Sequence, residues 1–163
     1  MTELLTAIEN SAISVWLRES NSIWAYPTVL TLHTVGLALL VGANAALDLR
    51  VLGVARTIAV ADLQPLMRWM WIGFWMNALS GVVLLAADAT TKVAAPMFLI
   101  KLGLVVAGVV VLKALARQVY GPAAAPGVIT PAARSLAIAS LAIWFVAIAA
   151  GRLMAYPGLF FGI

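Results

Sequence analysis

His33 is the only histidine of the chain, and it lies inside a long apolar stretch. An imidazole at membrane depth needs a hydrogen-bonding partner or a metal to offset its burial. Gly36 lies one helical turn further on, on the same side of a helix, where it would let a neighbouring helix or a flat macrocycle come close. His33 is therefore either an axial ligand to a haem iron or a residue that hydrogen-bonds across a helix bundle and only stabilises its packing.

Three charged residues in other apolar stretches are candidates for the same site. Lys101 lies about one and a half turns inside one such stretch, Arg152 lies about one turn before Tyr156 in another, and Asp88 stands at the end of a third. Taken singly, the two basic residues fit long side chains that reach the lipid headgroups. Together with His33 they predict a net-positive pocket that opens toward one side of the membrane, with Asp88 as a counter-ion. Such a pocket would suit an anionic ligand, and the haem propionates are one example.

Asn77 belongs to a stripe of small and polar residues in one apolar stretch, together with Gly73, Ser80 and Gly81. Such stripes let membrane helices pack closely, and that explains the pattern without any ligand. The alternative is that Asn77 hydrogen-bonds His33 and fixes its tautomer, as an outer partner of a metal-ligating histidine does.

The residues that are absent exclude several classes of chemistry. The chain has no cysteine, which removes disulfides, thiolate metal sites, covalent haem attachment and cysteine nucleophiles. One histidine without cysteine cannot form a zinc site of the usual types. No Walker loop, GxSxG elbow or HExxH motif occurs in the sequence, so the common nucleotide-binding, hydrolase and metalloprotease signatures are missing.

The composition is that of a membrane protein. Hydrophobic residues make up 64% of the 163 residues and charged residues only 10%, whereas a soluble domain carries about 25% charged residues. Lipid must therefore cover most of the surface. The net charge of +4 fits basic anchors at anionic headgroups. No Lys/Arg cluster forms a soluble basic face, so a nucleic-acid partner is not expected.

The hydropathy pattern predicts an all-α fold, an integral membrane four-helix bundle in a single domain covering residues 1–163. Apolar residues at helical spacing over 3–20 predict a short amphipathic helix along the interface. Four longer segments are each close to the ~20 residues that cross a bilayer: about 23–47, 66–87, 96–115 and 132–156. The segment GPAAAPGVITP between the last two spans cannot be helical throughout.

The distribution of Lys and Arg predicts the orientation. Six of these residues flank the first-to-second and third-to-fourth connections, against three on the opposite side. By the positive-inside rule, both termini then face outward, which in a Gram-negative cell is the periplasm.

The segment WLRESNSIWAYPTVLTLHTVGLALLVGANAALDLRVLG, residues 16–53, resembles an uncharacterised family of bacterial four-helix inner-membrane proteins. The shared pattern also includes a lysine early in the third span and a G-R-x-x-A-Y ending. The resemblance covers nearly the whole chain and implies no assigned function. The matching positions are Trp16, Pro27, His33, Gly36, Gly42, Asp48, Arg50, Gly53, Lys101, Gly151, Arg152, Ala155 and Tyr156.

More distantly, the chain is similar to four-helix haem-binding protoporphyrinogen oxidases and to the membrane domain of copper-resistance proteins. In the oxidases a histidine in an early span and a lysine opening a later span serve haem or porphyrin, and His33 and Lys101 resemble those two residues. This resemblance implies haem b as the cofactor. The oxidases carry further histidines that this chain lacks, which argues against a low-spin electron carrier with two strong axial ligands.

Three hypotheses about function follow. In the first, His33 ligates a b-type haem or porphyrin in a redox or haem-handling role, with Gly36, Asn77, Lys101 and Arg152 around the site and a redox partner or a second copy as the protein partner. In the second, the chain is a non-enzymatic membrane subunit or scaffold whose buried polar residues only fix helix packing. In the third, an outward-facing site binds a quinone or another lipophilic small molecule.

Overall fold

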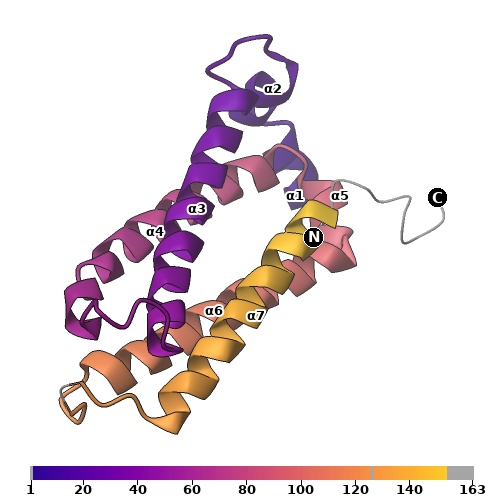
Figure 1. Cartoon of the computed structure of the whole chain (residues 1–163). Coiled ribbons are helices and arrows are strands. Elements are labelled where there is room, and N and C mark those ends of the chain that lie inside the picture. The colour runs from indigo at the N-terminus through magenta and orange to yellow at the C-terminus, as the bar shows by residue number, and fades with distance from the viewer. Residues whose placement is uncertain (1, 126, 154–163) are drawn as a thin grey trace. The chain divides into compact units, whose positions relative to one another are not determined.

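The structure, a computed structural model, describes residues 2–125 and 127–153, and this part of the chain is helical without strands. Figure 1 shows the helices in chain order. The C-terminal part of the expected fourth span, with Ala155 and Tyr156 of the family pattern, lies outside the described residues. The helices are α1 (Thr2–Glu9), α2 (Ala12–Glu19), α3 (Tyr26–Val51), the 3-10 helix η1 (Val60–Leu63), α4 (Leu66–Ala86), α5 (Ala89–Ala94), α6 (Pro96–Tyr120) and α7 (Pro131–Leu153).

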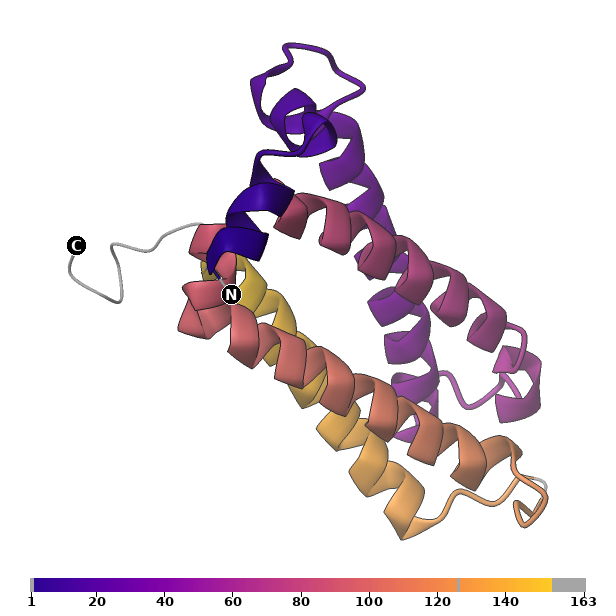
Figure 2. The same cartoon turned by 180° about the vertical axis from the view of Figure 1, so that it is seen from behind.

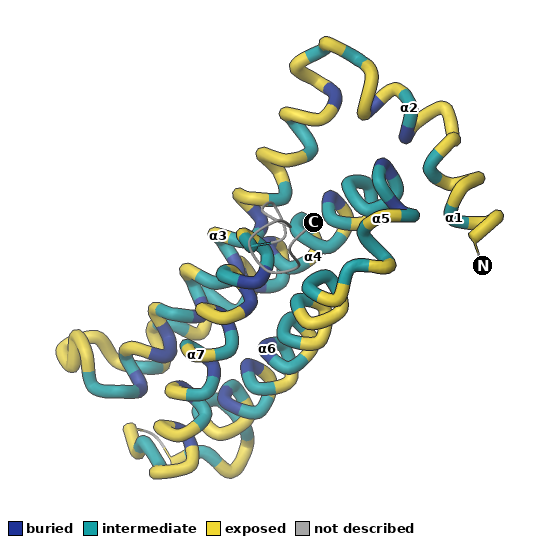
Figure 3. The backbone as a smooth tube through the Cα atoms, turned by 90° about the vertical axis from the view of Figure 1, so that its right-hand side faces the viewer, coloured by how far each residue is buried: buried dark blue, intermediate teal, exposed yellow. Residues whose placement is uncertain are grey.

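Four helical segments are long and apolar enough to cross a membrane, and the chain is a multi-pass membrane protein. They contain α3, α4, α6 and α7. Their large apolar side chains point outward, for example Val106, Val110 and Phe145, which are 58%, 60% and 75% exposed. Figure 3 shows exposed residues along each of these helices. Lipid is the medium that such a surface matches.

The chain divides into two compact units. The first contains Met1–Leu40 and Trp69–Pro96, and the second contains Val41–Arg68 and Met97–Ile163. In the first unit the early part of α3 packs on α4. In the second unit α6 and α7 run side by side in opposite directions, as Figures 1 and 2 both show.

The N-terminal segment forms two short helices, where the sequence predicted one helix over residues 3–20. Ser11 separates them because its hydroxyl accepts the backbone N–H of Ser14 and caps the start of α2. Such a cap requires a non-helical backbone at the capping residue. Ser14 then donates to the backbone carbonyls of Ile8 and Ala86, at 2.9 Å and 3.2 Å, so α2 is fixed against the end of α4.

Charged side chains hold α1 and α2 on the rest of the first unit. The Glu9 Oε2 atom accepts from the backbone N–H and the hydroxyl of Thr90 in α5, at 3.0 Å and 2.6 Å. Arg18 Nη1 lies 3.7 Å from Glu9 Oε1 and donates to the Ala87 carbonyl at 2.7 Å. Beneath them Leu17, Ala25 and Ala87 form a small buried apolar cluster. The two helices are thus docked on this unit rather than hanging free.

The ends of the long helices differ from the sequence boundaries. The first long helix begins at Tyr26 and continues to Val51, and the third continues to Tyr120. The connection after α3 is held by Arg50, which donates to the carbonyls of Ile58 and Arg56. The segment expected to be non-helical separates α6 from α7, as predicted. The short helix α5 was not predicted.

Candidate functional site

His33 lies on α3, partly buried, and its ring is held by α4. The ring atom Nδ1 is 3.0 Å from the backbone carbonyl oxygen of Asn77 and 3.3 Å from the Ser80 hydroxyl. A carbonyl oxygen only accepts hydrogen bonds, so this contact places a hydrogen on Nδ1. In the neutral ring the lone pair is then on Nε2, which is the arrangement of a histidine that ligates a metal through Nε2.

Asn77 contacts His33 through different atoms from those the sequence suggested. Its side-chain amide donates to the backbone carbonyl of His33 at 2.7 Å, while its backbone carbonyl holds the ring. The tautomer is therefore fixed by the main chain of α4. The Ser80 hydroxyl, which also contacts the ring, lies 2.6 Å from the Met76 carbonyl and 3.1 Å from the Asn77 carbonyl of the same helix.

Gly36 and Gly73 let the backbones of α3 and α4 meet. A Cβ at Gly36 would lie 2.6 Å from the Asn77 nitrogen, and one at Gly73 would lie 2.6 Å from the Leu40 nitrogen. Of the two neighbours expected for Gly36, a helix or a macrocycle, the structure places a helix there. The stripe of Gly73, Asn77, Ser80 and Gly81 accordingly forms the face that α4 turns to α3, because a Cβ at Gly81 would meet His33 Cε1 at 3.1 Å.

Lys101 and Arg152 belong to the second unit. The aliphatic stem of Lys101 crosses α7 at Gly151, where an added Cβ would be 3.3 Å from Lys101 Cε. Glycine at 151 thus leaves room for the lysine, and Arg152, one residue on, is exposed. Asp88 belongs to the first unit and lies 3.4 Å from Lys92 Nζ, one turn along the chain. A common pocket for His33, Lys101, Arg152 and Asp88 stays a prediction.

The donor set around His33 decides whether a haem or a free metal ion fits there. His33 supplies one nitrogen in the required tautomer. Within residues 2–125 and 127–153 no group of three or more His, Asp or Glu could hold a bare metal ion, so a metal at His33 would have to arrive in a macrocycle that supplies its other ligands. On these grounds His33 fits a haem or metalloporphyrin and does not fit a free ion.

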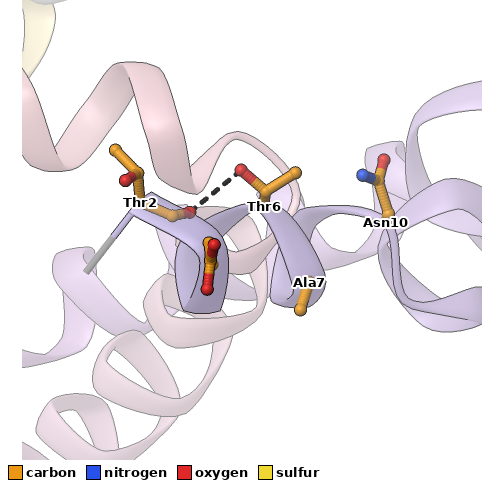
Figure 4. A pocket seen from close by; sticks show the side chains of 5 residues that line it. Thr2, Thr6, Ala7 and Asn10 are labelled. Carbon is orange, nitrogen blue, oxygen red and sulfur yellow. Dashed lines mark hydrogen bonds between the residues drawn. The ribbon is translucent and has the colours of Figure 1, made fainter.

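Two shallow surface hollows were also considered as sites. One lies on α1 and is lined by Thr2, Glu3, Thr6, Ala7 and Asn10; Figure 4 shows it, with the Thr6 hydroxyl donating to the Thr2 carbonyl at 2.9 Å. The other is lined by residues at the start of α3 and just before it, Ile23, Pro27, Thr28, Thr31 and Leu32. Each is lined by one short stretch of chain, so neither encloses a ligand.

A second polar cluster lies in the second unit, at positions to which the sequence analysis gave no functional role. Asn44 Nδ2 donates to Asp48 Oδ2 at 2.6 Å and to Ser140 Oγ at 2.7 Å. All three side chains are fully buried. The signal in the sequence was the spacing: Asn44 and Asp48 are four residues apart in α3, as are Ser140 and Trp144 in α7, so each pair lies on one helix face.

Comparisons with known proteins add no identification. No known protein family, no curated protein and no solved structure matches this chain.

Proposed function

We propose that this chain is a small protein of the bacterial inner membrane that binds a b-type haem or a porphyrin through His33. One observation carries the proposal: the Asn77 carbonyl accepts from Nδ1–H and so directs the lone pair to Nε2. Metal-ligating histidines usually donate their second ring N–H to such an oxygen, which fixes the ring and raises the basicity of the ligating nitrogen.

The assignment of roles rests on the first unit alone. His33 Nε2 would ligate the iron, the Asn77 carbonyl orients the ring, and Gly81 leaves the space in which the ring edge lies. A bound haem would supply redox chemistry or a coordination site. With one histidine in the whole chain, bis-histidine ligation from a single copy is excluded. Haem or porphyrin handling therefore fits better than fast electron transfer, for which two strong axial ligands are preferred.

The test is an absorption spectrum, oxidised and dithionite-reduced, of protein purified in mild detergent after expression with haem supplied. We expect a Soret band in the wild type and its loss in His33→Ala. Thr34→Ala is the matched control, because Thr34 is the next residue of α3, is exposed, and bonds only its own helix at Leu30. A wild type without a Soret band, or a band unchanged in a folded His33→Ala, would refute haem ligation by His33.

A second candidate function is a non-enzymatic membrane subunit or scaffold. The observation that favours it is the pair of hydrogen bonds between His33 and Asn77, beside the close glycine contacts. These contacts account for the packing of α3 on α4 without any ligand. This role predicts that His33→Ala lowers the thermal unfolding temperature while no chromophore is present to be lost. The same spectra, paired with thermal unfolding monitored by circular dichroism, separate the two functions.

The proposed location includes an orientation. Six of the Lys and Arg residues lie near the α3–α4 and α6–α7 connections, and three lie on the other side, so we propose that these connections face the cytoplasm and both termini face outward.

A further inference from the structure

Asp48 is an acid in the middle of a buried polar cluster. It is 0% exposed, as are Asn44 and Ser140, and Trp144 one turn along α7 is 1% exposed. The cluster joins the second half of α3 to α7 within one compact unit. Ionisable residues inside membrane spans are rare, because a charge there lacks water, and they mark functional sites by default.

Among the described residues, the groups that contact the Asp48 carboxyl are neutral. These are the Asn44 amide and the Ser140 hydroxyl. On its own helix, Arg50 bonds the carbonyls of Ile58 and Arg56 instead. The cationic side chains of α6 and α7 lie elsewhere: Lys101 is beside Gly151, eleven residues along α7 from Ser140, and the exposed ones are Lys113, Arg117, Arg134 and Arg152. The Tyr120 hydroxyl donates to the Val60 carbonyl.

The hydrogen bonds of the cluster satisfy the amide nitrogen of Asn44 but leave two buried oxygens over. Asn44 uses both hydrogens of its amide nitrogen, one to Asp48 Oδ2 and one to Ser140 Oγ. The two remaining oxygens, Asn44 Oδ1 and Asp48 Oδ1, are buried and have no hydrogen-bond partner within residues 2–125 and 127–153. Both are acceptors if Asp48 is ionised, so neither can satisfy the other. Buried polar atoms without partners are costly and are uncommon in native proteins.

We propose that Asp48 is a proton-binding site inside the membrane span, and that it shares its proton with Asn44. A proton on Asp48 Oδ1 makes that oxygen a donor, and Asn44 Oδ1 is an acceptor with no other partner. With the Asn44 Nδ2–Asp48 Oδ2 bond already present, the carboxylic acid and the amide form a cyclic pair with two hydrogen bonds. The same proton removes the charge. Of the buried atoms without a partner in the described residues, Trp144 Nε1 is then the one that still lacks a hydrogen bond.

The proton would then act as a latch between α3 and α7. When Asp48 is protonated, the pair is neutral and Asn44 remains turned to Ser140, so the two helices stay joined. Release of the proton leaves a buried carboxylate that keeps its contacts with Asn44 Nδ2 and Ser140 but has no donor for Oδ1, and this favours separation of the helices or entry of water. The contact between α3 and α7 is therefore expected to respond to proton release from one residue.

The test is infrared spectroscopy of the protein in lipid vesicles at neutral pH. The chain has three aspartates, Asp48, Asp62 and Asp88, so Asp62→Asn/Asp88→Asn leaves Asp48 as the only one. In this variant, labelled with carboxyl-¹³C aspartate, we expect a protonated-carboxyl C=O band that shifts to lower frequency relative to the unlabelled sample. The band should decrease as the pH is raised.

A single substitution gives the second measurement. Asp48→Asn replaces the acid with an amide that can make the same cyclic pair, so we expect it to fold, to lose the band, and to keep its unfolding temperature over the pH range in which the wild type loses stability. Exposed Asp62 provides the control, since Asp62→Asn should behave as the wild type. An Asp48 that shows only the ionised carboxylate band at every pH at which the protein is folded would overturn the proposal, even if Asp48→Asn fails to fold.

Discussion

At the scale of single residues, glycines that look alike in the sequence have different surroundings in the structure. Gly36 and Gly42 both lie in α3, but an added Cβ at Gly36 would meet the backbone of α4, whereas one at Gly42 would meet nothing within 4 Å. Backbone cannot move aside as a flexible side chain can. Glycine is therefore required for helix packing at Gly36, whereas at Gly42 it only weakens the helix.

Gly36→Ala is expected to open the α3–α4 contact and lower the free energy of unfolding by about 1–3 kcal/mol, the usual cost of overpacking. Gly42→Ala should be neutral or stabilising by up to ~1 kcal/mol, because alanine favours the helix. Thermal or denaturant unfolding in detergent measures both. Equal effects of the two substitutions would contradict the close contact at Gly36.

Sequence reasoning located His33 but could not assign its partner atoms. The spacing placed Asn77 near it, yet whether the amide or the carbonyl of Asn77 reaches the ring depends on the rotation of α4 about its axis. The same limit hid the Asn44–Asp48–Ser140 cluster. Asp48 lies near the end of α3, two residues before Arg50, where the sequence gives no sign that the acid is buried. Its burial becomes visible only when α3 is paired with α7.

At the scale of helices, the apolar lengths predicted four long helices, and four long apolar helices are present. The break between α1 and α2 could not be predicted in the same way, because apolar spacing continues through Asn10 and Ser11. The break depends on the cap at Ser11 and on contacts to a distant segment, Ala86 to Thr90. Long-range contacts of this kind are invisible in a local pattern.

The docking of α1 is expected to weaken in acid. The Thr90 hydroxyl and backbone N–H, which both donate to its carboxylate, lower the pKa of Glu9 from its ordinary value of 4.5, and Arg18 lowers it further. A carboxyl with a lowered pKa stabilises the folded form fully above its unfolded value, and that contribution is lost as the pH falls through the folded pKa. Docking should thus be complete at neutral pH and loosen below about pH 4.5.

Hydrogen–deuterium exchange of the α1 amides, corrected for the intrinsic pH dependence of exchange, measures this loosening. In Glu9→Ala we expect fast exchange at neutral pH and no further loosening in acid. Exposed Glu3, on the same helix, gives the control Glu3→Ala, which should retain the protection and the acid response of the wild type. Protection of α1 that is independent of Glu9 would show that other contacts hold this helix.

At the scale of the whole molecule, the distribution of side chains is inverted relative to a soluble protein. Asn44, Asp48, Ser80 and Ser140 are buried, while large apolar residues such as Val82, Val106 and Phe145 are exposed. In water such a surface would be unfavourable, whereas in hydrocarbon it is the expected one, and polar groups must then find partners inside the protein. The polar side chains of the His33 site meet this requirement, whereas Asn44 Oδ1 and Asp48 Oδ1 would meet it only with the proposed proton on Asp48.

The proposed orientation of the chain in the membrane rests on its basic residues and can be measured directly, because the chain has no cysteine to give background labelling. Asn21→Cys lies between α2 and α3, and Thr57→Cys lies between α3 and η1; both positions are exposed. With both termini outward, a membrane-impermeant maleimide should label Asn21→Cys in intact spheroplasts and Thr57→Cys only after the membrane is opened. Equal labelling of both after solubilisation is the control. The reverse pattern would place the basic connections outside, and the His33 half of α3 would then face the cytoplasm.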